Sequence, residues 1–391
     1  MDASGSIVEG PRTAEGTLHD DVNRSDEVIL QDLEYICEKL ENVFTRMAGS
    51  RLLITGGAGF LGFYLVQSVL HWNDQSASRN EISVTVYDNY IRGVPAWLER
   101  LKADSNLSLV THDITKPLPK DMGDFDFIIH AASIASPIYY RRYPIETMDA
   151  NVHGLRSLLD YSLAQKDSSR PVRGFLFYST SEIYGDPSSE DIPTPETYRG
   201  NVSCTGPRAC YDESKRFGET LCVNFAQSYD LPIRVARPFN NYGPGLKITD
   251  RRVLPDFASD VLNGRDIEML SDGSPTRTFC YVADAVVGYY KILIDGRNGE
   301  AYNIGTEKPE VSVHELAERV VRIARETFGY EGRVVRGAST DSNYLTDNPN
   351  RRCPVIQKAR SELGFSPEID LDEGLLRSLI WYSENMNAEE A

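Results

Sequence analysis

The stretch LLITGGAGFLG, Leu52–Gly62, predicts the fold of this chain. Its apolar first half is typical of a buried strand, and glycines follow where that strand would meet a helix. Glycines at such a junction permit a tight turn and let backbone N–H groups approach a pyrophosphate at the positive end of the helix dipole. The stretch therefore predicts a dinucleotide-binding turn, with contacts from Gly56, Gly59, Phe60, Leu61 and Gly62.

Short β-branched runs alternate with helical patterns after Ser50, which predicts an α/β fold of the Rossmann type with a doubly wound parallel sheet. The expected strands are Arg51–Thr55, Ser83–Tyr87, Ser108–Thr111, Phe125–His130, Gly174–Ser179 and Ile233–Arg237. The expected helices lie near Leu61–His71, Pro95–Lys102, Ile145–Leu163 and Tyr211–Ser228. Beyond Asn240 the pattern loosens into Pro- and Gly-rich loops with further helices such as Val313–Thr327.

These patterns predict two main units, as the length of 391 residues also suggests at about 100–200 residues per domain. We expect the dinucleotide-binding domain over residues 50–242, rejoined by residues 276–296. Residues 243–275 and 297–385 are expected to form a smaller C-terminal substrate lobe.

The second strand ends in VTVYDN, where Asp88 is expected to bind the adenosine ribose with Asn89 beside it. A carboxylate there would repel a 2′-phosphate, so the sequence favours NAD over NADP, although Arg92 nearby argues weakly the other way. In THDIT, Asp113 and Ile114 are expected near the adenine; the alternative is that Asp113 only caps a turn.

The composition excludes several classes of protein. The 58 acidic and 41 basic residues give a net charge of -17, which opposes binding to nucleic acid or to an anionic membrane. No apolar run reaches the ~18 residues of a spanning helix, and the first twenty residues lack a signal sequence, so we expect a cytoplasmic protein. The six cysteines form no C-x-x-C pair and are expected to be reduced thiols, with no metal site.

The N-terminus divides into two parts. Residues 1–24 are small and polar without periodicity, and we expect them to be disordered. Residues 25–49 predict an amphipathic helix that Ser25 caps and that stops near Gly49. Its apolar stripe either packs on the main body or forms a contact with a partner.

Tyr211 and Lys215 form Y-x-x-x-K, which places both side chains on one face of a helix. A lysine cation lowers the pKa of a phenol, so Tyr211 could take a hydroxyl proton while hydride leaves to nicotinamide. Tyr35 and Lys39 repeat the pattern on the N-terminal helix, which we interpret as coincidence. The hydroxyl expected beside Tyr211 is found in Ser179-Thr180-Ser181-Glu182, directly after a strand.

The motifs TGGAGFLG, STSEIYGDP and YDESK, with the strand-end Asp88, resemble the extended short-chain dehydrogenase/reductase family of NAD-dependent nucleotide-sugar epimerases, dehydratases and decarboxylases. The resemblance runs from about Arg51 to Glu384. The stretches HAASIASPIYYRRYP and GPRACYDESKR look most like its UDP-glucuronate decarboxylase branch. The resemblance implies that the cofactor is NAD and that the substrate is a nucleotide sugar, with a UDP-sugar expected first. It also implies a homodimer through the helices that begin near Ile145 and Tyr211.

The resemblance also implies roles at the site. Thr180 would bond the sugar 4-hydroxyl beside Tyr211, Lys215 would also hold the nicotinamide ribose, and Glu182 would be the acid/base group near carbon 5. The implied cycle is oxidation at carbon 4, loss of carbon dioxide and return of hydride. Dehydratases of the family carry an Asp where this chain has Ser181. The other residues implied in substrate binding are Ser136, Tyr139, Asn240, Arg252, Arg277 and Arg352.

This chain departs from the family pattern at five positions, namely Phe63, Tyr64, Gly245, Pro275 and Val355. Those departures keep two alternatives open, an epimerase or 4,6-dehydratase acting on another nucleotide sugar. A third alternative is an NAD-binding sensor or scaffold. The intact set of Thr180, Tyr211 and Lys215 argues against a scaffold, which has no need of all three.

Overall fold

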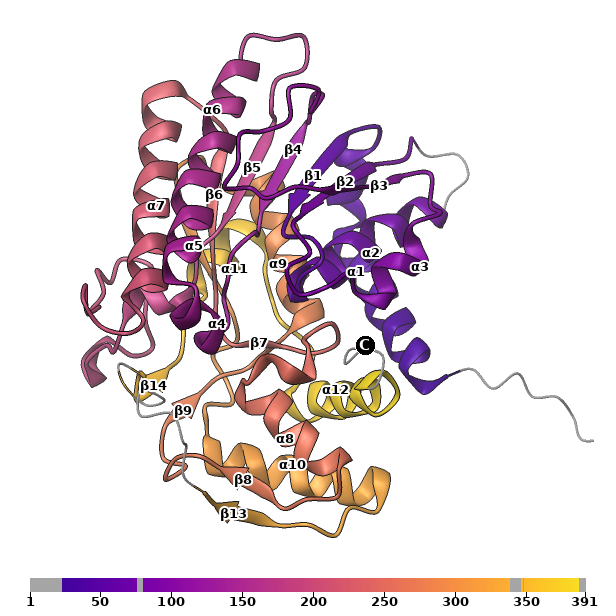
Figure 1. The fold of residues 1–391 in the computed structure, drawn as a ribbon, viewed down its shortest axis with the longest axis vertical. Coiled ribbons are helices and arrows are strands. Elements are labelled where there is room, and N and C mark those ends of the chain that lie inside the picture. Colours follow the sequence, from indigo (N-terminus) through magenta and orange to yellow (C-terminus); the bar gives the residue numbers. More distant parts are fainter. Residues whose placement is uncertain (1–22, 76–79, 338–345, 347, 387–391) are drawn as a thin grey trace, which may run out of the picture.

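The computed structural model describes residues 23–75, 80–337, 346 and 348–386. Nearly all of the expected disordered segment 1–24 lies outside these residues. Figure 1 shows a sheet covered by helices on both faces and a smaller lobe below it that carries α8, α10, β8 and β13. The predicted α/β class with a C-terminal lobe is confirmed.

The central sheet is parallel and has the strand order β11-β6-β5-β4-β1-β2-β3. Each face of the sheet has its own hydrophobic core, and alternate residues of β1 point to opposite faces. Leu52 and Ile54 pack in one core and Leu53 packs in the other. A sheet buried on both faces needs apolar strands, which explains why these runs are almost continuously hydrophobic. The strands are β1 (Arg51–Thr55), β2 (Ser83–Asp88), β3 (Leu107–Thr111), β4 (Phe127–His130), β5 (Gly174–Tyr178), β6 (Ile233–Pro238) and β11 (Ala301–Ile304).

Helices cover the two faces of this sheet. One face is covered by α5 (Pro144–Asp149), α6 (Leu155–Gln165) and α7 (Ala209–Tyr229), with a π-helical turn over Ala150–Gly154 between the first two. The other is covered by α1 (Arg24–Met47), α2 (Phe60–Asp74) and α9 (Val282–Asp295). Three shorter helices are α3 (Ala96–Leu101), α4 (Pro137–Arg142) and α11 (Gln357–Leu363).

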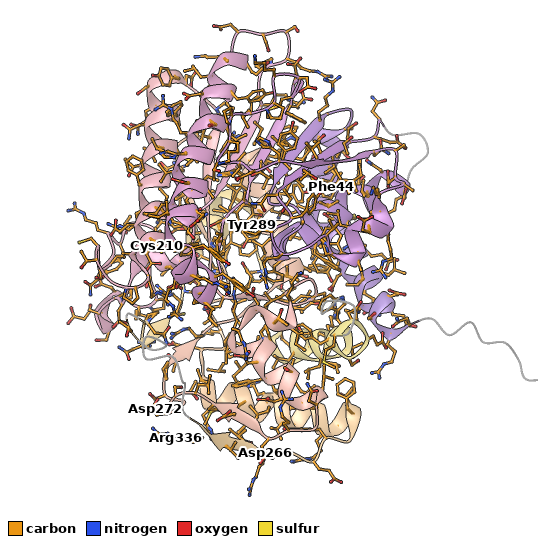
Figure 2. The ribbon with its side chains drawn as sticks, in the orientation of Figure 1. Phe44, Cys210, Asp266, Asp272, Tyr289 and Arg336 are labelled. Atoms are coloured by element: carbon orange, nitrogen blue, oxygen red, sulfur yellow. The ribbon has the colours of Figure 1, made fainter. Side chains whose placement is uncertain are left out.

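The lobe is built from helices and short strand pairs. Its helices are α8 (Val253–Leu262), α10 (Val313–Phe328) and α12 (Leu371–Asn385). Its strands are β8 (Ile267–Met269) with β13 (Val334–Arg336), and β12 (Val311–Ser312), β9 (Thr276–Arg277) and β14 (Arg351–Arg352). A third pair, β7 (Asn241–Tyr242) and β10 (Cys280–Tyr281), joins the lobe to α9. Figure 2 shows Phe44 and Tyr289 inside the sheet domain and Asp266, Asp272 and Arg336 at the outer end of the lobe.

The expected boundary of the lobe is wrong at β11. We placed residues 297–385 in the lobe, but Ala301–Ile304 pairs with β6 and forms the seventh strand of the sheet. After β6 the chain passes through the lobe and then forms α9. Strand β11 follows and pairs with β6 at the edge of the sheet, which completes a crossover connection. A four-residue run in a Gly-rich region carries too weak a pattern to indicate this strand.

Helix α1 packs on the body of the protein. Its apolar stripe, from Val28 to Met47, is buried against α2, α9 and α12. Its N-cap is Asn23, whose side chain accepts from the Ser25 N–H, so the expected cap at Ser25 is wrong by two residues. Either residue type can cap a helix, and the sequence alone did not separate them.

Candidate active site

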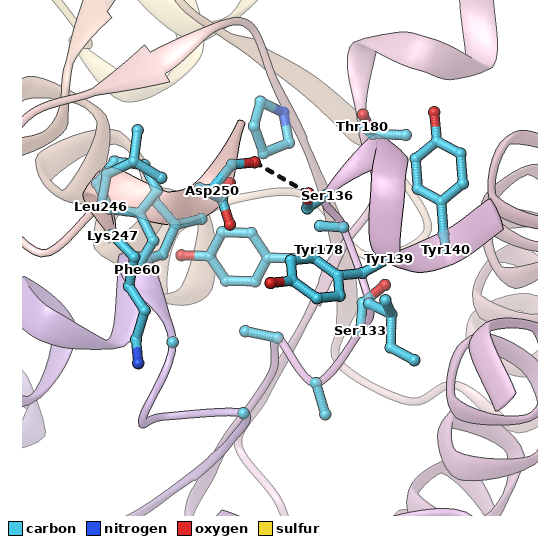
Figure 3. Close-up of a pocket in the computed structure, with 18 of the residues that line it drawn as sticks. Phe60, Ser133, Ser136, Tyr139, Tyr140, Tyr178, Thr180, Leu246, Lys247 and Asp250 are labelled. Carbon is cyan, nitrogen blue, oxygen red and sulfur yellow. Dashed lines mark hydrogen bonds between the residues drawn. The ribbon is translucent and has the colours of Figure 1, made fainter. Parts of the chain in front are cut away.

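A cavity of about 610 Å³ lies between the carboxyl ends of the sheet strands and the lobe. Ligands of doubly wound folds bind at this edge of the sheet. Of the predicted site residues, the cavity is lined by all except Arg352: Gly56, Gly59, Phe60, Leu61, Gly62, Asp88, Asn89, Asp113, Ile114, Ser136, Tyr139, Thr180, Ser181, Glu182, Tyr211, Lys215, Asn240, Arg252 and Arg277. Figure 3 shows part of this lining.

The glycine turn between β1 and α2 cannot hold larger residues. Gly56 has a φ of 74°, and a Cβ on it would lie 2.6 Å from the Ala132 backbone. A Cβ on Gly62 would lie 2.0 Å from the Gly57 carbonyl oxygen. These close approaches direct the N-terminus of α2 at the cavity, as the binding of a pyrophosphate requires, so the turn fits NAD.

Asp88 ends β2 and reaches back to that turn. Its Oδ2 accepts from the Ala58 N–H at 3.1 Å, and its Oδ1 accepts from the Tyr90 N–H at 2.8 Å. Burial raises the pKa of Asp88, and these two backbone hydrogen bonds act against that rise. Asp88 therefore fixes the phosphate turn as well as lining the cavity where a ribose would lie.

Asp113 caps a turn and also lines the cavity. Its Oδ1 accepts from the backbone N–H and the hydroxyl of Thr115, at 3.0 Å and 2.8 Å, so it caps a turn. It also lines the cavity together with Ile114. Asn89 lines the cavity too, with its Oδ1 held by the Ile91 N–H at 3.1 Å.

Tyr211 and Lys215 lie one turn apart on α7, with the Lys215 Nζ 5.9 Å from the centre of the Tyr211 ring. Burial raises the pKa of Tyr211 to about 12, and the hydrogen bond with Thr180 and the charge of Arg252 oppose this rise. Burial lowers the pKa of Lys215 to about 7, and its Nζ donates to the Tyr178 carbonyl oxygen at 2.8 Å. Thr180, Tyr211 and Lys215 therefore meet in one cavity.

Tyr140, which the sequence analysis did not select, stacks on Tyr211. The two rings are nearly parallel, with 7° between their planes and 5.1 Å between their centres. Tyr140 lies on α4 and is buried, so it restricts the ring of Tyr211. Tyr139 and Tyr140 are neighbours in the sequence, and only the structure shows that Tyr140 is the one that stacks on Tyr211 of α7.

Glu182 lies among arginines. It accepts hydrogen bonds from Arg208 and from Arg352, the latter at 3.1 Å. Burial acts to raise the pKa of Glu182, but the charges of Arg352, Arg208 and Arg277 outweigh it and hold that pKa at about 2. Glu182 is therefore a carboxylate at neutral pH and carries no proton to donate. Arg208 was missed, although it lies in the GPRACYDESKR motif.

Arg352 does not line the cavity, contrary to the expected contact with substrate. Its side chain is 2% exposed, and its Nη1 donates to the Ser181 carbonyl oxygen at 2.8 Å. Strand β14 pairs with β9 so that Arg352 lies opposite Arg277, and Arg277 alone of the two lines the cavity. Arg352 therefore supports Glu182 and Ser181 from behind.

The remaining predicted substrate residues have internal partners. The Asn240 Nδ2 donates to the Thr278 carbonyl oxygen at 2.9 Å, and its φ of 40° turns the chain into the lobe. The Ser136 Oγ donates to the Asp250 carbonyl oxygen at 3.0 Å, as Figure 3 shows. Arg277 donates to the carbonyl oxygens of residues 276, 349 and 350.

Three of the departures from the family pattern have structural partners. Gly245 has a φ of 86°, and a Cβ on it would lie 2.5 Å from the Phe63 Cβ. Phe63 also packs on Trp97 with 5.2 Å between ring centres. The neighbouring Tyr64 donates to Asp32 of α1. Phe63 and Gly245 are thus matched to each other, and Tyr64 is matched to the N-terminal helix.

The described residues contain neither a metal site nor a membrane-spanning helix. Within residues 23–75, 80–337, 346 and 348–386, His, Cys, Asp and Glu side chains form no group that could hold a metal ion. In the same part of the chain, every helix is too short or too polar to cross a membrane. The six cysteines are free thiols.

The NAD dependent epimerase/dehydratase family matches residues 52–305, and the chain belongs to this family. Among its relatives, UDP-glucuronic acid decarboxylase 3 of Arabidopsis thaliana is 38% identical over 325 residues, which cover 83% of this chain and 86% of that protein. UDP-glucuronic acid decarboxylase 1 of Xenopus tropicalis is 35% identical over 336 residues, which cover 86% and 73%. The resemblance inferred from the motifs is confirmed.

Solved structures of the family have the same fold. The dTDP-glucose 4,6-dehydratase DesIV of Streptomyces venezuelae, solved with NAD bound, is 27% identical with a TM-score of 0.72, covering 86% of this chain and 98% of that one. A UDP-glucose 4-epimerase of Thermotoga maritima, solved with UDP-glucose, is 26% identical with a TM-score of 0.72, covering 86% and 99%. NAD is the cofactor that the family and the geometry of the turn indicate.

Proposed function

We propose that this protein is an NAD-dependent decarboxylase that converts UDP-glucuronate to UDP-xylose or UDP-4-keto-xylose. One observation carries the proposal: Thr180, Tyr211 and Lys215 share a cavity with an arginine-bound Glu182 and with Ser181. The first three can oxidise a sugar hydroxyl, and the arginines provide positive charge for an acidic sugar nucleotide. The similarity to UDP-glucuronic acid decarboxylases supports the same substrate.

NAD, when bound, supplies a hydride acceptor for carbon 4 and later returns the hydride. Tyr211 takes the proton of the 4-hydroxyl, and Thr180 orients that hydroxyl. A phenol with a pKa of about 12 holds its own proton at neutral pH, so Tyr211 needs a nearby cation to act as base. Lys215 meets this need when it is protonated, and an anionic dinucleotide in the cavity favours its protonated form.

The second step explains why Ser181 suits a decarboxylase. A ketone at carbon 4 makes the carboxylate on carbon 5 a β-keto acid, which loses carbon dioxide without a dedicated acid. Elimination of a 6-hydroxyl, by contrast, needs a proton donor. Ser181 is a buried hydroxyl, and Glu182 is ionised, so neither provides that proton.

The diphosphate of the substrate is expected at the lobe side of the cavity. Arg252, Arg277 and Asn240 line this side, and guanidinium groups suit phosphate oxygens. Arg208 adds a further cation there. A strongly acidic protein needs such a local cluster to bind an anionic ligand.

We further propose that the protein is a homodimer through α5 and α7. These helices pack side by side on one face of the sheet. Ile145 on α5 and Phe217 on α7 are 60% and 50% exposed, so these adjacent helices offer apolar side chains that a second subunit could cover.

The reaction is tested by the products of two substrates. With NAD and UDP-glucuronate, the enzyme should release carbon dioxide and form a UDP-pentose or its 4-keto precursor, seen by mass spectrometry. dTDP-glucose should react slowly, because the acid for its dehydration is absent. A 4-keto-6-deoxy sugar from dTDP-glucose without carbon dioxide from UDP-glucuronate would indicate a dehydratase. A carbon-4 epimer that keeps its carboxylate would indicate an epimerase, and no conversion of any UDP- or dTDP-sugar would indicate an NAD-binding scaffold.

A further inference from the structure

One buried carboxylate joins the cofactor side of the cavity to the substrate side. Asp250 lies in the lobe, in the short 3-10 helix Ile248–Asp250 before α8, and its side chain is 3% exposed. Arg92 lies on the other side, in the loop after β2 that begins next to Asp88. Both residues line the cavity. We call Arg92, Asp250 and Arg252 the Asp250 bridge.

The two arginines of the Asp250 bridge are held differently. The Arg92 Nη1 donates a hydrogen bond to the Asp250 Oδ1 at 2.5 Å. The Arg252 Nε lies 2.9 Å from the Asp250 Oδ2, but this oxygen receives no hydrogen bond from the described residues. The Arg92 contact is thus an ion pair with a hydrogen bond, while the Arg252 contact rests on charge alone, which makes it the weaker of the two.

Further contacts hold the loop of Arg92 in place over the cavity. The Lys247 Nζ donates to the Arg92 carbonyl oxygen at 2.9 Å, which adds a second tie between the loop and the lobe. The Arg92 guanidinium lies 4.8 Å from the centre of the Tyr139 ring. The Ser136 hydroxyl donates to the Asp250 carbonyl oxygen and so fixes the backbone at Asp250. Residues 89 and 91–93 of the loop line the cavity, so the bridge ties the lobe to the loop that borders the cavity next to Asp88.

We propose that Asp250 is a positioning residue that retains NAD and couples its retention to the binding of substrate. A diphosphate that draws Arg252 away leaves the charge of Asp250 to Arg92 alone, which strengthens the tie across the loop. Because Arg252 holds Asp250 without a hydrogen bond, it is the arginine of the pair that a diphosphate displaces more easily. The identity of the diphosphate rests on the proposed function, whereas the tie between Arg92 and Asp250 does not.

Retention of NAD matters for a reaction that takes a hydride and gives it back. If the cofactor left between the two steps, the sugar would remain as its ketone. A bridge that tightens when substrate binds keeps the loop closed during this interval. The coupling is reciprocal, so NAD should also tighten the binding of the diphosphate.

The test measures the release of NAD from the full-length protein by stopped-flow, with and without UDP as the probe. In wild type, UDP should slow the release by roughly 5–150-fold, the usual range for coupling between two sites. Asp250→Asn and Arg92→Gln should each speed the release and remove most of the effect of UDP. The double variant should be no faster than either single variant, because both remove the same contact. Arg92→Lys, which keeps the charge, should recover part of the effect.

Asp260→Asn is the matched control, because it removes another carboxylate that pairs with an arginine in the lobe, at 3.0 Å from Arg265, outside the cavity. It should leave NAD release unchanged. Additive effects of Asp250→Asn and Arg92→Gln, or release equal to wild type in both, would overturn the proposal. Full slowing by UDP in Asp250→Asn would also overturn it. If calorimetry shows no binding of UDP to wild type while the two variants remain non-additive, the bridge stands and the proposed UDP-sugar function fails.

Discussion

Tyr211 is the residue on which the proposed chemistry depends most. Tyr211→Phe keeps the ring that stacks on Tyr140 but removes the proton acceptor. We expect kcat to fall by roughly 10²–10⁴, the usual cost of losing a general base. NAD binding, measured by calorimetry, should stay near wild type.

Tyr35→Phe provides the control for this variant, because Tyr35 begins the other Y-x-x-x-K copy. Its hydroxyl donates to Asp284 at 2.6 Å, away from the cavity. Turnover per folded molecule should be unchanged in Tyr35→Phe. If Tyr211→Phe turns over at the same rate as Tyr35→Phe, Tyr211 has a packing role only.

Lys215 gives a prediction about pH. Burial lowers its pKa from 10.5 to about 7, so between these values the unfolded chain binds a proton that the folded chain does not. The destabilisation by Lys215 is therefore complete below the folded pKa and fades as pH rises toward the unfolded one. Lys215→Met should raise the free energy of unfolding by roughly 1–4 kcal/mol at about pH 6. At about pH 10 this gain should nearly disappear.

Urea denaturation at the two pH values measures this difference. The comparison within one variant cancels the packing change from Lys to Met, which does not depend on pH. An equal change in the free energy of unfolding at both pH values would show that Lys215 keeps its ordinary pKa in the folded protein.

The sequence identified individual site residues where a motif fixes a position on an element. Tyr211, Lys215 and Thr180 follow from one helix and one strand end, and the structure brings them together. Arg352 was expected at the cavity and Arg208 was not selected, because their positions depend on the pairing of β14 with β9 and on the loop before α7. Pairing between distant short strands leaves almost no local pattern, so the sequence could not show that Arg352, unlike Arg252 and Arg277, lies outside the cavity lining.

The attachment of helix α1 to the body of the protein depends on a buried acid. Asp32 is 0% exposed and accepts from Tyr64 of α2, from Tyr281 of β10 at 2.6 Å and from Arg377 of α12 at 2.5 Å. Asp32→Ala leaves Arg377 without this partner and two buried hydroxyls without an acceptor. We expect the free energy of unfolding to fall by about 3–5 kcal/mol, as when one partner of a buried ion pair is removed.

Glu34→Ala on the exposed side of α1 is the control for Asp32→Ala, and its effect should stay within about 0.5 kcal/mol. Urea denaturation compares the two variants. An effect of Asp32→Ala as small as that of Glu34→Ala would mean that α1 is held by its apolar stripe alone.

The amphipathic pattern of α1 predicted a helix, and the structure decides between its two interpretations in favour of packing within the chain. A stripe of apolar side chains shows that a face must be covered, but not by what. Tyr64 is consistent with packing of α1 on α2, since it departs from the family pattern and its hydroxyl donates to Asp32 of α1. Strand β11 has no recognisable sequence pattern, because four residues are too few to show a period.

For the whole molecule, the proposed dimer predicts that a charge on the α5 and α7 surface separates the subunits. Phe217→Glu places a carboxylate on the exposed apolar face, and light scattering should then give the mass of a monomer. Leu30→Glu is the control, because Leu30 is 48% exposed on α1, and its mass should remain that of wild type. A wild-type monomer, or a dimer that only Leu30→Glu disrupts, would exclude this interface.

The most direct test of the proposed reaction follows the hydrogen of carbon 4 through a single turnover. UDP-glucuronate with deuterium at carbon 4 is mixed with excess enzyme that carries NAD, and the products are analysed by mass spectrometry. The proposed reaction releases one carbon dioxide for each substrate consumed. We also predict that the UDP-pentose carries deuterium at carbon 4, or that a 4-keto pentose is formed while the deuterium is found on the reduced cofactor. Release of carbon dioxide with no deuterium in either place, or a product that keeps its carboxylate, would contradict it.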